Sequence, residues 1–264
     1  GKTTALQRQM IGGTSNSIGM AIAPLVISYL IFHGTPLHDI VTKQFIIPLI
    51  ILILIMLIIT LLVGKTQMPS IDNVRQAPGE KFDKSVWSFR NLKLGVWGIF
   101  FYVGIEVAVG ANVNMYASEL GGSFASNATH MAALYWGLLL LGRFLGSFIK
   151  QVPSEKQLVI ASIGAIVLLM LAMLTANPWI LTLIGFFHSI MWPAIFTLAT
   201  DQLGKYTTKA SGVLTMGVIG GGIIPLLQGI FADVMGGNWL WTWLLIIAGE
   251  AYILYYGLNG YKQH

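Results

Sequence analysis

Residues 45–63 read FIIPLIILILIMLIITLLV, a run of nineteen positions without a charged side chain. About 20 apolar residues, each rising ~1.5 Å along a helix axis, cross the hydrocarbon core of a bilayer. A helix in lipid pairs all of its own backbone groups, whereas the strands of a membrane barrel are shorter and alternate apolar with polar side chains. The run therefore predicts a transmembrane helix.

Seven further blocks of the chain have the same character. The sequence is 55% hydrophobic and 9% charged, whereas a soluble domain carries about 25% charged residues and could not cover its surface with so few. We therefore expect an all-α polytopic membrane protein with eight spans. The other seven blocks cover residues 11–33, 94–116, 131–149, 157–175, 178–200, 211–232 and 239–257.

The basic residues predict the direction of the spans. If the eight blocks cross the membrane alternately, fourteen of the fifteen Lys and Arg residues fall on one side, and only Lys43 falls on the other. Cytoplasmic loops of membrane proteins carry this excess of positive charge. We expect a cytoplasmic C-terminus, and we interpret the net charge of +5 as a sign of topology rather than of nucleic-acid binding.

One long polar loop divides the chain. Residues 64–93 are basic and contain Pro69 and Pro78, which predicts a cytoplasmic linker. Residues 1–63 would then be the last two helices of an N-terminal bundle, and residues 94–264 a C-terminal bundle of six. This 2 + 6 arrangement looks like a 6 + 6 transporter without its first four helices, so we expect the chain to be part of a longer protein.

Five groups of short motifs follow one another at matching places in this topology. In this order the chain resembles the fucose/glucose–galactose proton symporters of the major facilitator superfamily, along nearly its whole length. The motifs are NSIG (16–19) with AP (23–24), YVGIEV (102–107), YWG (135–137) with GRFLGS (142–147), FHSIMWP (187–193), and GGGIIP (220–225) with QG (228–229) and Asp233.

This resemblance implies a partial major-facilitator fold, with helices five to twelve of the family in one chain. It implies secondary active transport of a hexose-type sugar of the glucose, galactose or fucose class, coupled to a proton, in a bacterial inner membrane, with no cofactor. The missing N-terminal helices would be partners, so we expect no transport by this chain alone. Gly13 and His188 depart from the Gln and Asn common in the family, which leaves the sugar open.

Glu106 is the most informative single residue, because it lies in the middle of a span. A charged group at the bilayer centre costs about 2.5–3.5 kcal/mol, so its side chain should face the protein or a water-filled cavity. It would accept hydrogen bonds from a sugar or carry the coupling proton; the alternative is a structural carboxylate. Tyr102 and Gly110 share its helix face and Asn114 lies nearby, which predicts a polar stripe with a notch for a sugar ring.

Three further residues are candidates for binding the substrate. Asn16 both donates and accepts hydrogen bonds, as a sugar hydroxyl requires, but it would equally suit a bond between helices. His188 and Trp192 are four positions apart, on one face of a helix kinked by Pro193, where an indole ring stacks on a sugar or the pair simply packs.

Two residues of the block 131–149 complete the candidate site. Tyr135 shares a helix face with Gly142 and Gly146, which indicates that it points into the bundle and contacts the substrate. The resemblance implies that Arg143 is an element of the cytoplasmic gate, although a basic residue near the inner end of a span also snorkels to the membrane surface.

The same residues bear on other kinds of function. A major-facilitator carrier of another small solute, such as a nucleoside, an organic acid or a drug, is the main alternative. An intramembrane enzyme or a metal site would need clustered ligands, but the chain has no cysteine and its five His residues are scattered. A purely structural membrane protein would have no use for polar residues at mid-depth, among them Glu250, a second intramembrane acid without an evident partner.

Overall fold

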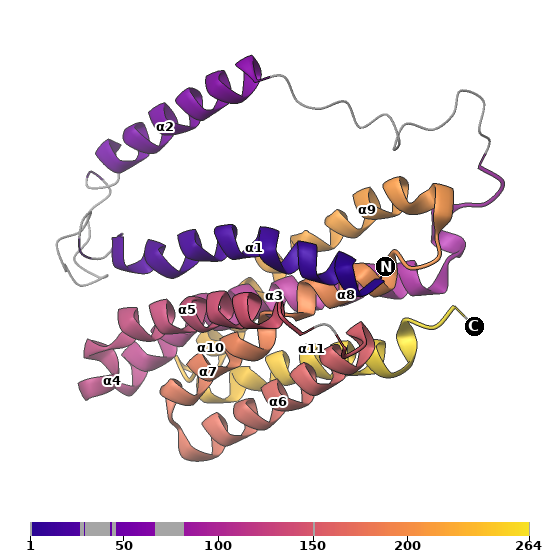
Figure 1. Ribbon diagram of the computed structural model, residues 1–264. Coiled ribbons are helices and arrows are strands. Elements are labelled where there is room, and N and C mark those ends of the chain that lie inside the picture. Colours follow the sequence, from indigo (N-terminus) through magenta and orange to yellow (C-terminus); the bar gives the residue numbers. More distant parts are fainter. Residues whose placement is uncertain are drawn as a thin grey trace. The chain divides into compact units, whose positions relative to one another are not determined.

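The computed structural model describes residues 2–26, 46–66, 82–149 and 151–263, together with Tyr29 and Lys43. Every regular element in this part of the chain is a helix (Figure 1). The chain forms two compact units, of which one comprises Gly1–Ile22 and Phe82–His264 and the other Ala23–Lys81. The all-helical fold expected from the sequence is confirmed.

The smaller unit contains helix α2 (Ile46–Lys65), which includes most of the apolar run of residues 45–63. None of its side chains is buried within the chain, and apolar residues surround the helix on all sides. A helix that is apolar all round is stable only in lipid or among other helices. The predicted span over residues 45–63 is therefore present as a helix.

The larger unit is a bundle of long helices joined by short turns and single helical turns. Its α-helices are α1 (Lys2–Leu25, which extends three residues past the unit), α3 (Arg90–Leu120), α4 (Gly122–Ser126), α5 (Ala128–Gly146), α6 (Ser154–Thr175), α7 (Pro178–His188), α8 (Met191–Ala199), α9 (Thr207–Thr215), α10 (Gly220–Val234) and α11 (Trp243–Tyr255). Single turns are η5 (Val86–Ser88), η6 (Gly204–Tyr206), η7 (Met216–Ile219), η8 (Leu240–Thr242) and η9 (Tyr256–Gly260).

Each of the eight predicted blocks contains a helix, but six helical stretches of the described residues are by themselves long and apolar enough to span a membrane. The predicted start of the first block is wrong, because α1 begins at Lys2 rather than at Ile11. The two helices below the threshold are α1 and α5, and each has both buried and exposed polar side chains: Ser17 and Arg143 are buried, whereas Asn16 and His130 are exposed. The six stretches are Ile46–Lys65, Arg90–Leu120, Ser154–Thr175, Pro178–Ala199, Gly204–Val234 and Leu240–Gly260.

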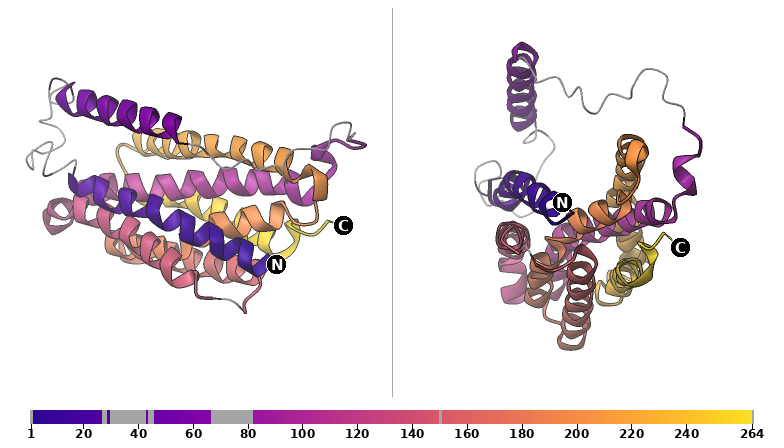
Figure 2. Two further views of the ribbon diagram at one scale, coloured as in Figure 1. Left: turned by 45° about the horizontal axis from the view of Figure 1, so that its top comes forward. Right: turned by 45° about the vertical axis from the view of Figure 1, so that its right-hand side comes forward.

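Helix α3 is the centre of the larger unit. It packs against α5, α7, α8, α10 and α11, and the helices of this unit run alongside one another in both views of Figure 2. Seventeen of its residues are buried, including Glu106 and Asn112. The amide of Asn112 donates to Gln228 Oε1 of α10 at 2.9 Å, and Gln228 Nε2 donates to Thr242 Oγ1 at 3.1 Å. A polar chain therefore links α3, α10 and the start of the last span.

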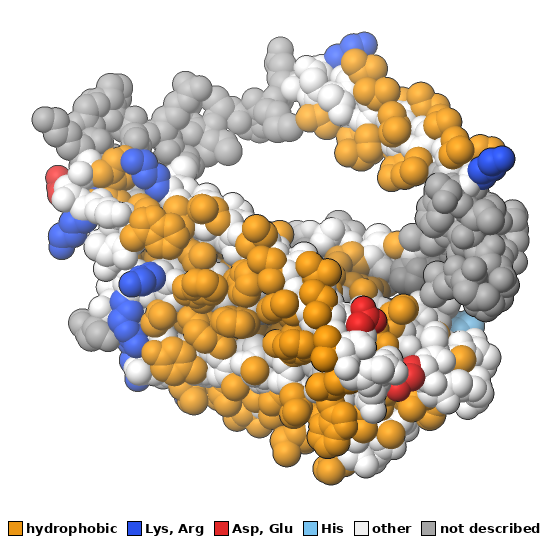
Figure 3. Space-filling view, turned by 180° about the vertical axis from the view of Figure 1, so that it is seen from behind, with side chains coloured by type: hydrophobic (Ala, Val, Ile, Leu, Met, Phe, Trp, Pro, Cys, Tyr) orange, Lys and Arg blue, Asp and Glu red, His pale blue; other side chains and the backbone are white. Residues whose placement is uncertain are grey.

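The surface of the larger unit matches a membrane environment. Large apolar side chains cover its side, with basic side chains gathered at one end of the unit (Figure 3). Soluble monomers rarely expose continuous apolar patches of more than a few hundred Å². The outer apolar belt, together with polar groups that are buried and bonded inside a mainly apolar core, is what a helical bundle needs when its solvent is lipid.

Pro193 divides the sixth predicted block into two helices. The sequence predicts a single kinked helix with His188 and Trp192 on one face, but α7 ends at His188 and α8 starts at Met191. Proline has no N–H to donate, and its ring clashes with the carbonyl four residues earlier, which belongs to Ser189. The Ser189 carbonyl is thus left free of a helical partner, and it lies at the centre of the candidate site.

Candidate functional site

A buried ion pair joins α3 and α5. Arg143 Nη2 lies 3.2 Å from Glu106 Oε1, and the two side chains are 8% and 9% exposed. The Tyr102 hydroxyl, one helical turn before Glu106, donates to the same carboxylate oxygen at 2.6 Å. Glu106 therefore faces the protein, as the sequence predicts, and it shares a face of α3 with Tyr102.

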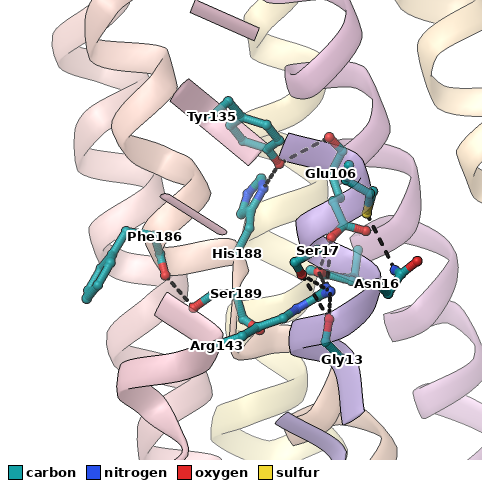
Figure 4. A network of polar contacts seen from close by, with 11 residues as sticks. Gly13, Asn16, Ser17, Glu106, Tyr135, Arg143, Phe186, His188 and Ser189 are labelled. Atoms are coloured by element: carbon teal, nitrogen blue, oxygen red, sulfur yellow. Dashed lines mark hydrogen bonds and ion pairs between the residues drawn. The ribbon is translucent and has the colours of Figure 1, made fainter. Parts of the chain in front are cut away.

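The Arg143 guanidinium also binds α1 and the break between α7 and α8 (Figure 4). Its Nη1 donates to Ser17 Oγ at 2.7 Å and to the Gly13 carbonyl at 3.4 Å. Its Nε donates at 3.3 Å to the Ser189 carbonyl that Pro193 leaves without a helical donor. Arg143, in the last turn of α5, thus joins its own helix to α1, to α3 and to the α7–α8 break.

Two glycines let α5 and α7 approach closely enough for these contacts. A Cβ atom on Gly142 would lie 2.7 Å from the Ser189 Cβ and 2.8 Å from the Phe186 carbonyl oxygen. A Cβ atom on Gly185 would overlap the Tyr135 carbonyl oxygen. Since neither helix has room for a larger residue, the backbones set the positions of Tyr135 and Arg143 relative to His188.

A second buried chain of contacts lies beside the ion pair. The Tyr135 hydroxyl is 2.6 Å from His188 Nδ1 and donates to the Glu106 backbone carbonyl at 3.1 Å. On the other side of the ring, His188 Nε2 is 2.6 Å from Glu250 Oε1 of α11. All three side chains are fully buried. Glu250, which the sequence left without a partner, is therefore bonded to a predicted site residue.

Aromatic rings line the same region. The Tyr102 ring centroid lies 6.4 Å from that of Trp192 and 6.2 Å from the His188 ring, and Trp192 is half-buried. The predicted notch at Gly110 is wrong as an open space, because the Trp136 ring packs directly over this glycine. The small residue there accommodates an indole of the protein itself.

Two predicted substrate-binding residues are not joined to this network in the structure. Asn16 is exposed, and its Nδ2 contacts Met20 Sδ at 3.5 Å on its own helix. Asn114 is half-buried, and its carbonyl accepts from the Ser118 hydroxyl at 2.8 Å. Both side chains are free of the Glu106–Arg143 contacts that bring the other candidates together.

Ser17, rather than its neighbour Asn16, is the residue of α1 that reaches the network. Leu6, Met10, Gly13 and Ser17 are spaced by four, three and four positions, the spacing of one helix face. Leu6, Met10 and Ser17 are buried, whereas Asn16 is exposed. This periodicity is visible in the sequence, and it would have identified Ser17 before the structure was known.

The assembled site offers one carboxylate paired with a guanidinium, and one histidine placed between a carboxyl and a phenol. Among the residues that the structure describes, no group of three or more His, Cys, Asp or Glu side chains is arranged to hold a metal ion. Carboxylate, imidazole, hydroxyl and guanidinium groups bind hydroxyl groups and hold protons. This chemistry suits a polar, uncharged solute and a proton.

The chain is similar to bacterial proteins that are named as sugar transporters. A glucose/galactose transporter of Brucella abortus biovar 1 is 33% identical over 268 residues, which cover 98% of this chain and 65% of the relative. An L-fucose-proton symporter of Escherichia coli K12 is 29% identical over 199 residues, 72% of this chain and 45% of the relative. The chain therefore spans less than two thirds of the length of either protein.

Solved structures and the family assignment agree with these relatives. A crystal structure of the E. coli fucose:proton symporter superposes with a TM-score of 0.76 at 25% identity, over 98% of this chain and 70% of that one. Residues 8–225 match the family described as Major Facilitator Superfamily. With its all-helical bundle, its apolar outer surface and this match over most of its length, the chain belongs to the Major Facilitator Superfamily.

Proposed function

We propose that the protein carries a hexose-type sugar of the glucose, galactose or fucose class across a membrane, coupled to a proton, by alternating access. The proposal rests on one observation: the pair of Glu106 and Arg143 is buried within the helical bundle and bonded to Ser17 of α1. Buried ionisable residues are costly in a membrane and mark solute or ion pathways. The relatives named as sugar transporters supply the class of solute.

The partly exposed residues are proposed to meet the sugar. Asn16, Asn114 and Trp192 retain accessible surface, so their amides and indole ring are available to hydroxyl groups and to the apolar face of a pyranose. The buried members of the proposed set, Glu106, Tyr135 and His188, are hydrogen-bonded to one another or to neighbouring groups. The full proposed substrate-binding set is Asn16, Glu106, Asn114, Tyr135, His188 and Trp192.

Arg143 is proposed to act as the gate, because its guanidinium joins α1 to α3 and to the α7–α8 break. In transporters of this kind, one half of the molecule rocks against the other around a central site. The contacts of Arg143 with Ser17 and Gly13 have to separate when α1 moves away from α5. Glu106 is the proposed proton-coupling residue, since protonation would remove the charge that holds Arg143.

The setting of the protein is part of the proposal. We propose a bacterial inner membrane with a cytoplasmic C-terminus, because nearly all Lys and Arg residues fall on one side of the spans. The four helices that the resemblance places before α1 stay a prediction. The site moves its solute without chemical change, so we propose no catalytic activity.

Uptake of labelled sugar by the full-length protein tests the proposal. Cells lacking their own hexose carriers should accumulate labelled glucose, galactose or fucose, and the accumulation should collapse when a protonophore removes the proton gradient. Competition among the three unlabelled sugars ranks them. If none of the three labelled sugars is taken up, but a labelled nucleoside, organic acid or drug is, the site belongs to a carrier of another solute.

A further inference from the structure

The hydroxyl of Tyr135 lies between two partners and has one hydrogen to give. It is 3.1 Å from the Glu106 backbone carbonyl and 2.6 Å from His188 Nδ1. A carbonyl oxygen only accepts hydrogen bonds, so Tyr135 donates to it. Both contacts then exist together only if His188 Nδ1 donates its own hydrogen to the Tyr135 oxygen. The observed geometry therefore corresponds to a histidine protonated at Nδ1.

The contact of the opposite ring nitrogen, His188 Nε2, with Glu250 requires a second proton. His188 Nε2 and Glu250 Oε1 are 2.6 Å apart, and both side chains are fully buried. With Nδ1 protonated, this contact needs one further proton between the nitrogen and the oxygen, carried by either partner. The pair is uncharged overall in both cases. Without that proton, either a nitrogen lone pair would face a carboxylate or the Tyr135 contacts would have to change.

The surroundings of Glu250 oppose a separate negative charge. Its second oxygen, Oε2, has no hydrogen-bond partner among the described residues. A buried carboxylate is stable only when its oxygens are paired, because burial removes the water that would otherwise solvate it. Sharing a proton with His188 keeps the net charge of this region at zero.

We infer that His188 and Glu250 form a proton-binding site, and that loss of its proton turns the Tyr135 hydroxyl. When one proton leaves to water, His188 keeps a hydrogen on Nε2 and donates it to the Glu250 carboxylate. Nδ1 becomes an acceptor, so the Tyr135 O–H rotates from the Glu106 carbonyl to Nδ1. The pair changes from zero charge to −1, and no covalent bond between heavy atoms changes.

The other charged groups near this pair are already balanced or lie at a distance along their helices. Glu106 is paired with Arg143 in this structure, so its charge is balanced. Helix α8 has no acid or base, and α6 carries its titratable residues in its first turn. The titratable groups closest to the pair are Tyr102 and Glu106 of α3 and Tyr135 and Arg143 of α5. The other titratable residues of the surrounding helices are Arg90, Lys93, Tyr116 and Glu119 of α3, His130 of α5, Glu155 and Lys156 of α6, and Tyr252 and Tyr255 of α11.

The proton site itself is tested without any substrate. Infrared difference spectra of the purified full-length protein, recorded as the pH is changed stepwise from acid to alkaline, should contain histidine and carboxyl signals that change together. The signals should disappear in the Glu250→Gln variant and persist in Glu155→Gln, the matched change on α6. Signals that survive Glu250→Gln, or no such signals in the wild-type protein, would overturn the inference.

The link to Tyr135 and the site rests on the proposed function, and sugar exchange measures it. Exchange of labelled against unlabelled sugar across proteoliposomes needs no gradient, so its pH profile reports the site directly. The Glu250→Gln variant keeps a hydrogen-bonding amide beside His188 and leaves every residue of the proposed substrate-binding set in place. It should still exchange sugar but lose the pH step of the wild-type protein, whereas an unchanged profile would refute the link.

Variants that fail to fold do not obscure the result, because thermal melting of each purified variant is recorded beside its spectrum. If Glu250→Gln melts at low temperature, it is replaced by Glu250→Met, which is also neutral. If no sugar is exchanged but the infrared signals depend on Glu250, the proton site stands and the sugar proposal fails. If sugar is exchanged but the infrared signals do not depend on Glu250, the sugar proposal stands and the proton site fails.

Discussion

The Glu106–Arg143 pair concentrates charge in the interior, so removing one member leaves the other without a partner. Glu106→Gln keeps the shape of the side chain but leaves the buried guanidinium facing a neutral amide. Breaking a buried pair in this way costs about 3–5 kcal/mol. We expect a clearly lower melting temperature of the purified protein and loss of uptake.

A double-mutant cycle separates stability from transport at this pair. Arg143→Met removes the remaining charge, so the Glu106→Gln/Arg143→Met variant should be destabilised by less than the sum of the two single changes. Uptake should nevertheless stay abolished, because Ser17 and the Ser189 carbonyl lose their donor. Additive melting shifts, or recovered uptake in the double variant, would contradict a functional ion pair.

At the scale of helices, the contact of α5 with α7 depends on Gly142. A methyl group there would meet the Ser189 side chain and the Phe186 carbonyl, and overpacking of this kind typically costs about 1–3 kcal/mol. Gly137 lies on the same helix, with open space where its Cβ would be. We expect Gly142→Ala to lower both melting temperature and uptake.

Gly137→Ala is the matched control. In a helix, alanine is more stable than glycine by about 0.5–1 kcal/mol, so this variant should melt at the same or a slightly higher temperature. If both substitutions behave alike in thermal melting, the close approach at Gly142 is not what holds α5 against α7.

The break between α7 and α8 gives a prediction about shape rather than stability. Pro193→Ala restores an N–H that can pair with the Ser189 carbonyl, so the helix can run on from His188 to Trp192. We expect melting temperature to be maintained while uptake falls, since Trp192 moves relative to the site. Pro178→Ala is the control, because proline in the first turn of α7 removes no helical bond. Unchanged uptake in Pro193→Ala would refute a role for the break.

Some of these helices can be predicted from the sequence and others cannot, because a sequence pattern can define the length of a helix without defining where it breaks or begins. The run in residues 45–63 specifies α2, since apolar length alone defines a span. The break after His188 was foreseen only as a kink, because Pro193 removes a donor without dictating whether the helix bends or ends. The start of α1 was missed because its first turns are polar.

The candidate site also contains some features that the sequence predicts and others that it does not. The inward direction of Glu106 and Tyr135 follows from burial cost and helix periodicity, both of which are local. The partner of Glu250 lies 62 positions away on another helix, and no local pattern of one sequence connects the two. Asn16 was preferred on its chemistry, whereas the seven-residue spacing from Met10 to Ser17 places Ser17 in the interior.

For the whole molecule, the contact of α1 with α5 has to open during transport if the two halves rock. Ser17 is fully buried and bonded to Arg143, and the chain contains no cysteine. A Ser17→Cys variant of the full-length protein, free of other cysteines, should therefore react slowly with a maleimide at rest. Transported sugar should accelerate the reaction, because cycling separates α1 from α5.

The Ser162→Cys variant supplies the matched comparison. Ser162 is equally buried but lies within α6, which packs against α7, α8 and α11 of the same bundle. Since a rigid bundle keeps its interior closed while it rocks, labelling at this position should stay slow with or without sugar. Sugar-dependent labelling at both positions would indicate general loosening of the protein. Sugar-independent protection at Ser17 would show that α1 and α5 move as one body and that the gate lies elsewhere.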